Sequence, residues 1–73
     1  MTLQQLRYAI AVADCGSMNQ AAAKLFISQP SLTNAIHELE KEMNITIFDR
    51  TNKGIHISKD GEDFLGYARQ VLE

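Results

Sequence analysis

The stretch that decides the fold lies at residues 17–43 and reads SMNQAAAKLFISQPSLTNAIHELEKEM. Its first part begins with Ser17 and Gln20, a spacing typical of a capping box at a helix N-terminus. The alanine run at 21–23 has small side chains, which let a second helix approach closely. Because apolar residues recur here at helical spacing, we predict a short helix over about residues 18–25.

The second part of the stretch predicts another helix after a brief break. Phe26 and Ile27 are apolar residues between two helix signals, so we expect them to form a buried turn. Ser28 is a favourable N-cap, and Pro30 is tolerated in a first helical turn because those N–H groups have no intrahelical partner. The apolar stripe that follows is Leu32, Ile36, Leu39 and Met43. This helix should run over about residues 29–43.

On the N-terminal side, a further helix is predicted over about residues 3–14. Thr2 and Gln5 have the spacing of a second capping box, and Gly16 stands where a left-handed C-cap is needed. The helical stripe is Leu3, Leu6, Ile10 and Ala13.

On the C-terminal side, the period changes from helix to strand. Asn44 can end the preceding helix in a left-handed cap, and the apolar residues at 45–47 and 55–57 then alternate with polar ones. Turn-forming residues fill the interval 50–54, where Gly54 would supply a positive φ. We predict a two-stranded β-hairpin over about residues 45–57.

The last residues, 58–73, predict a fourth helix. Ser58 is its cap, and the acidic residues Asp60, Glu62 and Asp63 suit the N-terminal end of the helix dipole. Its apolar stripe is Phe64, Leu65, Ala68, Val71 and Leu72. Since no cap follows Leu72, we expect the helix to continue in a longer protein. The order of elements is that of a mainly α, winged helix-turn-helix fold, with a three-helix core, a hairpin wing and a C-terminal helix.

Composition limits the classes of function. The chain has 73 residues and a formal charge of −2, and it contains no apolar run long enough for a membrane span. No signal peptide is visible, so we expect a cytoplasmic protein without a membrane partner. Residues 1–57 hold five basic and five acidic residues, so the acidic surplus lies in residues 58–73. Residues 1–57 are therefore neutral overall, so DNA binding depends on which face of the domain carries each charge.

Catalysis and metal binding receive no support from the sequence. Cys15 is the only cysteine, so it forms no internal disulfide, and His37 and His56 are too far apart in sequence to complete a metal site with it. Cys15 is best interpreted as a small residue near a helix end. No nucleophile–base–acid set and no glycine-rich phosphate loop is present. We expect neither an enzyme nor a cofactor.

The helix at 29–43 carries a candidate DNA-reading surface. With the apolar stripe turned to the core, the opposite side presents a polar ridge of Pro30, Asn34, His37 and Lys41, with Thr33 at its edge. The acidic residues Glu38, Glu40 and Glu42 should project towards the flanks. The ridge is equally compatible with an ordinary solvated helix face.

Particular side chains of this surface have the chemistry for nucleic acid. Amides such as Gln29 and Asn34 can read adenine in the major groove. Arg50 and Lys53 flank the predicted hairpin tip, where phosphate or minor-groove contacts arise in winged proteins. The main alternatives are a helix-turn-helix used only for protein–protein contact and a winged helix of another regulator family. The ridge lacks the apolar anchor that a protein interface needs.

Six segments of the chain together resemble LysR-type transcriptional regulators. They are residues 3–8 (LQQLRY), 16–22 (GSMNQAA), 25–33 (LFISQPSLT), 36–40 (IHELE), 48–50 (FDR) and 58–62 (SKDGE). The resemblance covers essentially the whole chain. It implies a winged helix-turn-helix domain at 1–57, with the helix-turn-helix unit at 18–37 and the wing at about 45–57. Residues 58–73 would begin a linker helix that pairs two heads, and the effector domain would lie outside this chain.

The resemblance also implies partners and site residues. Members bind interrupted palindromic operators as homodimers or tetramers and respond to a small-molecule effector. By resemblance, the positions expected to contact DNA are Gln29, Pro30, Ser31, Thr33, Asn34 and Arg50. The polar ridge and the hairpin tip add His37, Lys41 and Lys53 to the expected contacts. The positions expected to contact a twin helix are Phe64, Leu65, Ala68 and Leu72. Phe64 and Leu65 could equally cover the chain's own core, whereas Leu72, near the chain end, is expected to meet a partner.

Four positions depart from the family pattern. Asn34 stands where the family often has arginine, and Gln20 where a basic residue is frequent. Asn44 replaces a usual glycine and Lys59 a usual proline. Two missing cations should weaken nonspecific attraction to phosphates, so the expected salt dependence of DNA binding is shallow.

Overall fold

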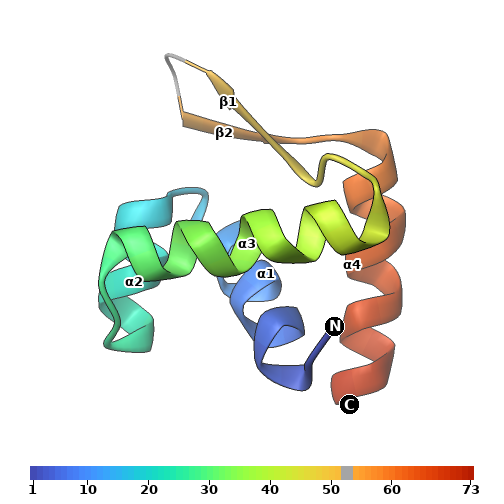
Figure 1. Ribbon diagram of the computed structural model, residues 1–73, viewed down its shortest axis with the longest axis horizontal. Coiled ribbons are helices and arrows are strands. Elements are labelled where there is room, and N and C mark those ends of the chain that lie inside the picture. Colours follow the sequence, from blue (N-terminus) through green and yellow to red (C-terminus); the bar gives the residue numbers. More distant parts are fainter. Residues whose placement is uncertain (52–53) are drawn as a thin grey trace.

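The computed structural model describes residues 1–51 and 54–73. In chain order its elements are α1 (Leu3–Cys15), α2 (Met18–Leu25), α3 (Gln29–Met43), β1 (Phe48–Thr51), β2 (Gly54–Ile57) and α4 (Lys59–Leu72) (Figure 1). The predicted bounds of α2 and α3 are confirmed, and α1 ends one residue later than expected. The winged helix-turn-helix order is therefore the observed one. No helix in the described ranges is both long and apolar enough to cross a membrane.

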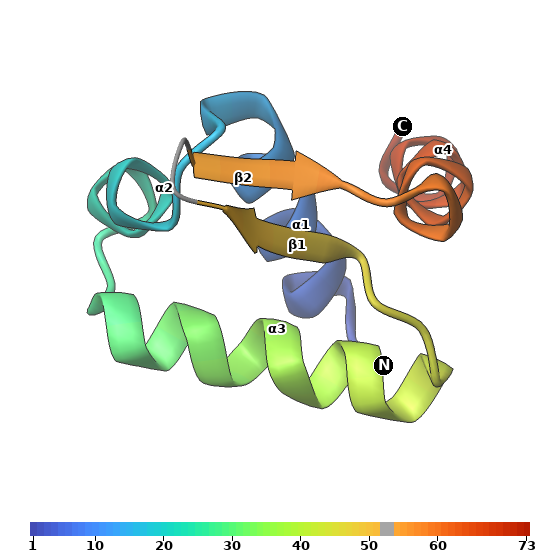
Figure 2. The same ribbon diagram turned by 90° about the horizontal axis from the view of Figure 1, so that it is seen from above.

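Helix α1 lies at the centre of the molecule and packs against each of the other three helices. Helices α2 and α4 flank it at opposite ends, and α3 runs across α1 and α2, with the hairpin along one side (Figures 1 and 2). The alanine run of α2 explains the close crossing, because Ala21 and Ala22 are buried. The buried apolar side chains are Leu6, Ala9, Val12, Met18, Ala21, Ala22, Leu32, Ile36, Leu39, Ile47, Phe48, Phe64, Leu65 and Ala68.

The helix ends follow the predicted caps. The Thr2 hydroxyl accepts the Gln5 N–H at 3.0 Å, and the Gln5 side chain accepts the Thr2 N–H at 2.9 Å, which completes a capping box. Ser17, at the start of α2, accepts the backbone N–H three residues later. Among the residues that the structure describes, no return bond from the Gln20 side chain accompanies it, so the predicted second box is a simple N-cap.

Left-handed residues end the first three helices. Gly16 and Asn44 take φ values of 70° and 55°, as predicted. Phe26 ends α2 with φ 60°, and here the prediction of a buried turn is wrong, because the Phe26 side chain is 94% exposed. The left-handed cap turns Phe26 outwards and returns Ile27 towards the core, where it is half-buried. The Ile27 N–H then bonds to the Ala22 carbonyl at 3.1 Å.

The hairpin is shorter than predicted. Strand β1 begins at Phe48, so the expectation of a strand over 45–47 is wrong. The Ile45 N–H bonds to the Glu40 carbonyl at 3.1 Å as part of the end of α3, and the Ile47 side chain is fully buried. The alternation at 45–47 therefore reflects packing against the core rather than cross-strand pairing. Strands β1 and β2 pair antiparallel from Phe48↔Ile57 to Thr51↔Gly54.

At Gly61, helix α4 packs closely against the base of the hairpin. The first turn of α4 passes so close to residue 47 that a Cβ on Gly61 would lie 2.4 Å from the Ile47 carbonyl oxygen. The same carbonyl accepts the Ser58 N–H at 3.0 Å. The Ser58 hydroxyl, which caps α4, also donates to the Thr46 carbonyl. These contacts fix the direction in which α4 leaves the hairpin.

Candidate nucleic-acid interface

Helix α3 presents its polar ridge to solvent, as its periodicity predicted. Leu32, Ile36 and Leu39 are buried, whereas the ridge residues Pro30, Asn34, His37 and Lys41 are all exposed. No strand or helix of residues 1–51 and 54–73 covers this side of α3 (Figures 1 and 2). An extended surface long enough to enter a groove is therefore available along the whole helix.

The N-terminal turn of α3 is well ordered by its cap. The Ser28 side chain accepts the Ser31 N–H at 3.2 Å and donates its own hydroxyl to the Ser31 oxygen at 2.8 Å. Pro30 lies within this first turn, where its missing N–H costs nothing. Pro30 and Ser31 are exposed and Gln29 is half-buried. The cap thus holds three candidate contact residues on a rigid turn.

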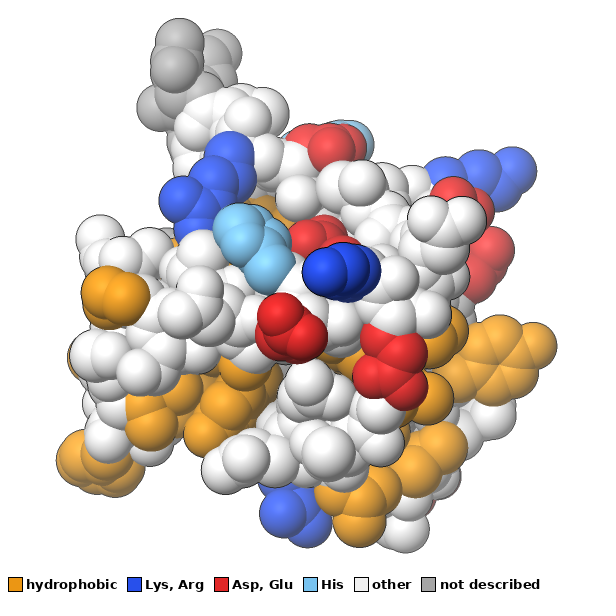
Figure 3. Space-filling model, in the orientation of Figure 1, with side chains coloured by type: hydrophobic (Ala, Val, Ile, Leu, Met, Phe, Trp, Pro, Cys, Tyr) orange, Lys and Arg blue, Asp and Glu red, His pale blue; other side chains and the backbone are white. Residues whose placement is uncertain are grey.

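Acidic side chains of α3 leave the N-terminal half of the ridge free. The Glu40 carboxylate turns towards the hairpin, where it accepts the Ile47 N–H at 2.7 Å and the Phe48 N–H at 3.2 Å. Glu42 pairs with the N-terminal ammonium group at 2.6 Å. Seen from the ridge, acidic side chains lie over the C-terminal half of α3 only (Figure 3). For Glu40 and Glu42 these contacts are consistent with the predicted position on the flanks, although no sequence signal pointed to the role of Glu40.

One hydroxyl joins the ridge to the wing. The Thr33 oxygen accepts the Gln29 side-chain N–H at 3.1 Å and the Arg50 guanidinium N–H at 3.2 Å. We call Gln29, Thr33 and Arg50 the Thr33 network. The sequence indicated each of these residues separately, but nothing in it showed that residues 17 positions apart meet.

The wing lies beside the start of α2 as well as over α3. A groove of about 230 Å³ separates these elements. It is lined by Gly16, Ser17, Met18, Asn19, Gln29, Arg50, Thr51, Gly54 and Ile55. Of the predicted wing contacts, Arg50 lies on β1 at this groove, and Lys53 lies outside the described residues. Asn19 is a polar groove residue that the sequence analysis missed, although its place in the first turn of α2 could have indicated it.

The predicted dimer contacts on α4 need correction. Phe64, Leu65 and Ala68 are buried in the chain's own core, and Leu72 is half-buried against it. These side chains turn inwards because α4 packs directly on α1. The exposed apolar side chains of α4 are instead Tyr67 (71% exposed) and Val71 (59% exposed).

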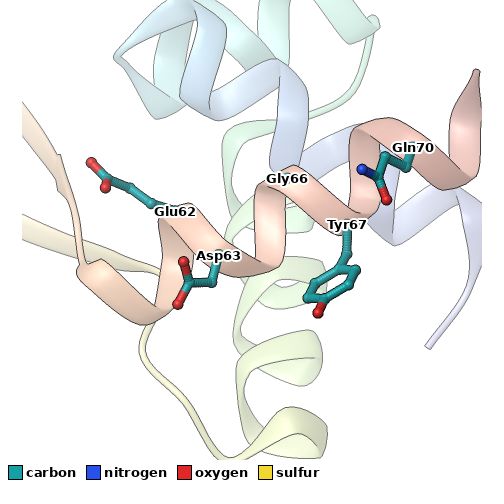
Figure 4. A pocket seen from close by; sticks show the side chains of 5 residues that line it. All are labelled: Glu62, Asp63, Gly66, Tyr67 and Gln70. Carbon is teal, nitrogen blue, oxygen red and sulfur yellow. The ribbon is translucent and has the colours of Figure 1, made fainter.

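The outer face of α4 carries a shallow hollow beside the exposed Tyr67. Its lining residues are Glu62, Asp63, Gly66, Tyr67 and Gln70 (Figure 4). A Cβ on Gly66 would meet no atom within 4 Å, so the hollow is open above this glycine. The spacing of 62, 63, 66, 67 and 70 is that of one helix face, a signal that the sequence offered and the apolar stripe obscured.

An exposed ion pair ties α4 to α1. The Arg69 guanidinium contacts the Asp14 carboxylate at 2.6 Å, and this hydrogen bond lowers the pKa of Asp14 below its ordinary value. The same contact raises the pKa of Arg69. Cys15, beside Asp14, is half-buried with a free thiol. No group of three or more metal-ligating side chains occurs in residues 1–51 and 54–73.

Comparison with known proteins gives a consistent result along the chain. Residues 3–62 match the model of the bacterial regulatory helix-turn-helix proteins of the lysR family. The HTH-type transcriptional regulator ClcR of Pseudomonas putida is 43% identical over 72 residues, which cover 99% of this chain and 24% of ClcR. The regulator TfdT of Cupriavidus pinatubonensis is 42% identical over 72 residues, covering 99% of this chain and 32% of TfdT. The chain thus spans about a quarter to a third of the length of these relatives.

Solved structures match equally well. The CbnR DBD in complex with DNA superposes with a TM-score of 0.94 at 39% identity, covering 99% of this chain and 83% of that one. The BenM DBD in complex with catB site 1 DNA gives a TM-score of 0.94 at 38% identity, covering 99% of this chain and 81% of that one.

Proposed function

The chain belongs to the LysR family of bacterial regulatory helix-turn-helix proteins, and we propose that it binds double-stranded DNA sequence-specifically as the DNA-binding domain of a transcription regulator. The observation that carries this proposal is the uncovered polar ridge of α3, whose N-terminal half is free of acidic side chains. Support comes from the CbnR and BenM domains, which share this fold and were solved with DNA.

The N-terminal half of α3 enters the major groove in this proposal, as the second helix of such motifs does. Gln29 and Asn34 have side-chain amides that can pair bidentately with adenine, and each such pair discriminates by about 1–3 kcal/mol. Pro30, Ser31 and Thr33 line the same approach. His37 and Lys41 follow along the ridge, where a backbone phosphate is the natural partner of a cation.

The wing contacts the DNA backbone or the minor groove. Arg50 extends from β1 beside the first turns of α3, so a duplex that receives α3 also passes the Arg50 guanidinium. Lys53 belongs to the same proposal through its place in the sequence. A net charge of −2 does not oppose binding, because residues 58–73 hold the acidic surplus.

The rest of the functional unit lies in a longer protein. We infer that residues 1–57 form the DNA-binding domain, that residues 58–73 begin a linker helix, and that a small-molecule effector acts through a further domain. Two copies would bind an interrupted palindrome, with higher assembly to tetramers. Tyr67 and Val71, as the exposed apolar residues of α4, replace the buried stripe as the proposed contacts between copies. We infer that a transcription regulator of this kind works in the cytoplasm and is not an enzyme.

Selection of binding sites from a random duplex pool at about 100 mM salt tests the proposal. We expect the chain to recover a two-fold-symmetric site. Asn34→Ala should blur one base position in each half-site, and Arg50→Ala should weaken binding to all sequences. Arg7→Ala removes an exposed cation away from the ridge, so it should change nothing.

A second selection uses two copies of the chain joined by a flexible linker. If this joined chain enriches no sequence, the proposal is overturned. Joining two copies removes the requirement for spontaneous pairing. Sedimentation gives a separate test of the α4 contact, since Val71→Asp should reduce self-association of the unjoined chain on operator DNA. Pairing that survives Val71→Asp and Tyr67→Asp together would refute the assignment of that face.

A further inference from the structure

We infer that Thr33 is a positioning residue that couples the reading helix α3 to the wing, and that it offers DNA a hydrogen-bond donor only. The inference deepens the proposed function and rests on it. It starts from the Thr33 network, in which one hydroxyl oxygen bonds to a side chain of α3 and to a side chain of β1.

The hydrogen-bonding capacity of a hydroxyl limits what Thr33 can do. A threonine hydroxyl has two acceptor lone pairs and one O–H donor. Gln29 and Arg50 donate to that single oxygen at 3.1 and 3.2 Å, which occupies both lone pairs. Only the O–H remains for a ligand. Thr33 should therefore pair with an acceptor, such as a purine N7, a thymine O4 or a phosphate oxygen, and not with the amino groups of adenine or cytosine.

The same bond fixes the orientation of the Gln29 amide. A side-chain amide has one carbonyl oxygen and two N–H donors. Bidentate pairing with adenine uses the carbonyl and one N–H, which leaves the second N–H of the same nitrogen for the Thr33 oxygen. The bond to Thr33 favours one of the two orientations of the Gln29 amide. Its half-buried position limits the other rotamers. The reading amide is thus preorganised before DNA arrives.

Arg50 is held against α3 without losing its charge. Its partner in the network is a neutral hydroxyl, and within residues 1–51 and 54–73 no carboxylate forms an ion pair with it. A guanidinium has five N–H donors, so four remain for phosphate oxygens. The bond to Thr33 sets the distance between the wing cation and α3. Docking of α3 and contact by Arg50 should therefore be energetically coupled rather than independent.

The first arm of the test needs no DNA. Nuclear magnetic resonance relaxation of the Gln29 amide and the Arg50 guanidinium compares wild type with Thr33→Val and Thr33→Ser. Valine keeps the branched shape and removes the hydroxyl, whereas serine keeps the hydroxyl. We expect Thr33→Val to raise the mobility of both groups and Thr33→Ser to preserve wild-type order. Thr46→Val makes the same chemical change at an exposed threonine outside the network and should leave both groups unchanged.

The second arm is a double-mutant cycle on the site recovered by selection. Thr33→Val alone should weaken binding roughly five- to tenfold, the usual range for losing one or two hydrogen bonds. It should also blur the base position that Gln29→Ala blurs. In the Thr33→Val background, Arg50→Ala should cost clearly less than it costs in wild type, because the coupling is already lost. Thr33→Ser should restore most of the affinity.

The outcomes separate the inference from the proposed function. Additive effects of Thr33→Val and Arg50→Ala, or unchanged mobility of Gln29 and Arg50 in Thr33→Val, would overturn the inference while wild-type binding still stands. Failure of the joined wild-type chain to bind any duplex sequence would overturn the proposed function and, with it, the role of Thr33 in reading DNA. The inference about Thr33 would be supported by nonadditive binding together with an unchanged melting temperature of Thr33→Val. If Thr33 only stabilised the fold, Thr33→Val would lower the melting temperature and its effect on binding would add to that of Arg50→Ala.

Discussion

Phe26 combines a left-handed backbone with an almost fully exposed aromatic ring. For a residue other than glycine, asparagine or aspartate, this left-handed conformation raises the free energy of the folded state by about 1 kcal/mol. Because the ring has little packing to lose, we predict that Phe26→Asn stabilises the chain by about 0.5–1 kcal/mol. Urea unfolding followed by circular dichroism measures the change.

Asn44 provides the matched control, since it caps α3 with the same left-handed geometry. Asn44→Phe should destabilise the chain by a similar amount, about 0.5–1 kcal/mol. A loss of stability in Phe26→Asn would show that the exposed ring makes contacts within the chain that its position does not indicate.

Gly61 is required by a close approach rather than by its dihedral angles. A methyl group there would lie 2.4 Å from the Ile47 carbonyl oxygen, and this backbone atom can move away only if the chain around it shifts. We predict that Gly61→Ala lowers the free energy of unfolding by about 2 kcal/mol or more. Gly66→Ala, in the same helix but facing open space, should raise it by about 0.5–1 kcal/mol through helix propensity. Equal effects of the two substitutions in thermal unfolding would refute this account.

At the scale of elements, the contact between α1 and α4 has a pH dependence that can be assigned. The Arg69 guanidinium lowers the pKa of Asp14 in the folded chain. A lowered folded-state pKa contributes stability at pH values above the unfolded pKa, about 3.9 for an aspartate, and this contribution is lost as pH falls through the folded pKa. Both groups are exposed, so the effect is small and salt reduces it.

Asp14→Asn tests that assignment. In urea unfolding at low salt, the free energy of unfolding should fall less for Asp14→Asn than for wild type as the pH is lowered from about 5 through the pKa of Asp14. Asp49→Asn removes an exposed carboxylate on β1 that forms no described ion pair, and it serves as the control. An identical acid dependence in Asp14→Asn and wild type would mean that the contact is absent in solution.

At the scale of the whole molecule, charge decides how strongly DNA binding depends on salt. The ridge and wing together offer few cations, and residues 20 and 34 are the neutral amides Gln and Asn. We predict a slope of log affinity against log salt that is shallower than about −6, the value for some seven phosphates at roughly 0.9 each. Fluorescence anisotropy of a labelled operator duplex from about 50 to 200 mM salt measures the slope.

Adding a cation gives the matched comparison. Asn34→Arg should steepen the slope by about 0.9 if residue 34 meets a phosphate, and it should leave the slope unchanged if residue 34 meets only a base. A wild-type slope steeper than about −6 would show that more cations reach the DNA than the described surface provides.

The sequence by itself determined the elements and most of their ends. Caps and helical periodicity are local signals, so Thr2, Ser28 and Ser58 located the helix starts, and Gly16 and Asn44 located two of the ends. The polar ridge of α3 also followed from periodicity alone, because one buried stripe fixes the opposite face. The roles of the ridge residues in DNA binding remain predictions.

Only the tertiary structure decided which faces meet. The alternating pattern predicted Ile47 as a strand residue, but its side chain is fully buried and its backbone packs closely against Gly61 of α4. The sequence left open whether Phe64 and Leu65 face a second copy or the chain's own core, and the packing of α4 on α1 buries both in the core together with Ala68. Thr33 and Arg50 meet because the hairpin folds back over α3. Local sequence encodes period and caps, but the partner of an apolar or polar face depends on packing between distant segments, which no single stretch contains.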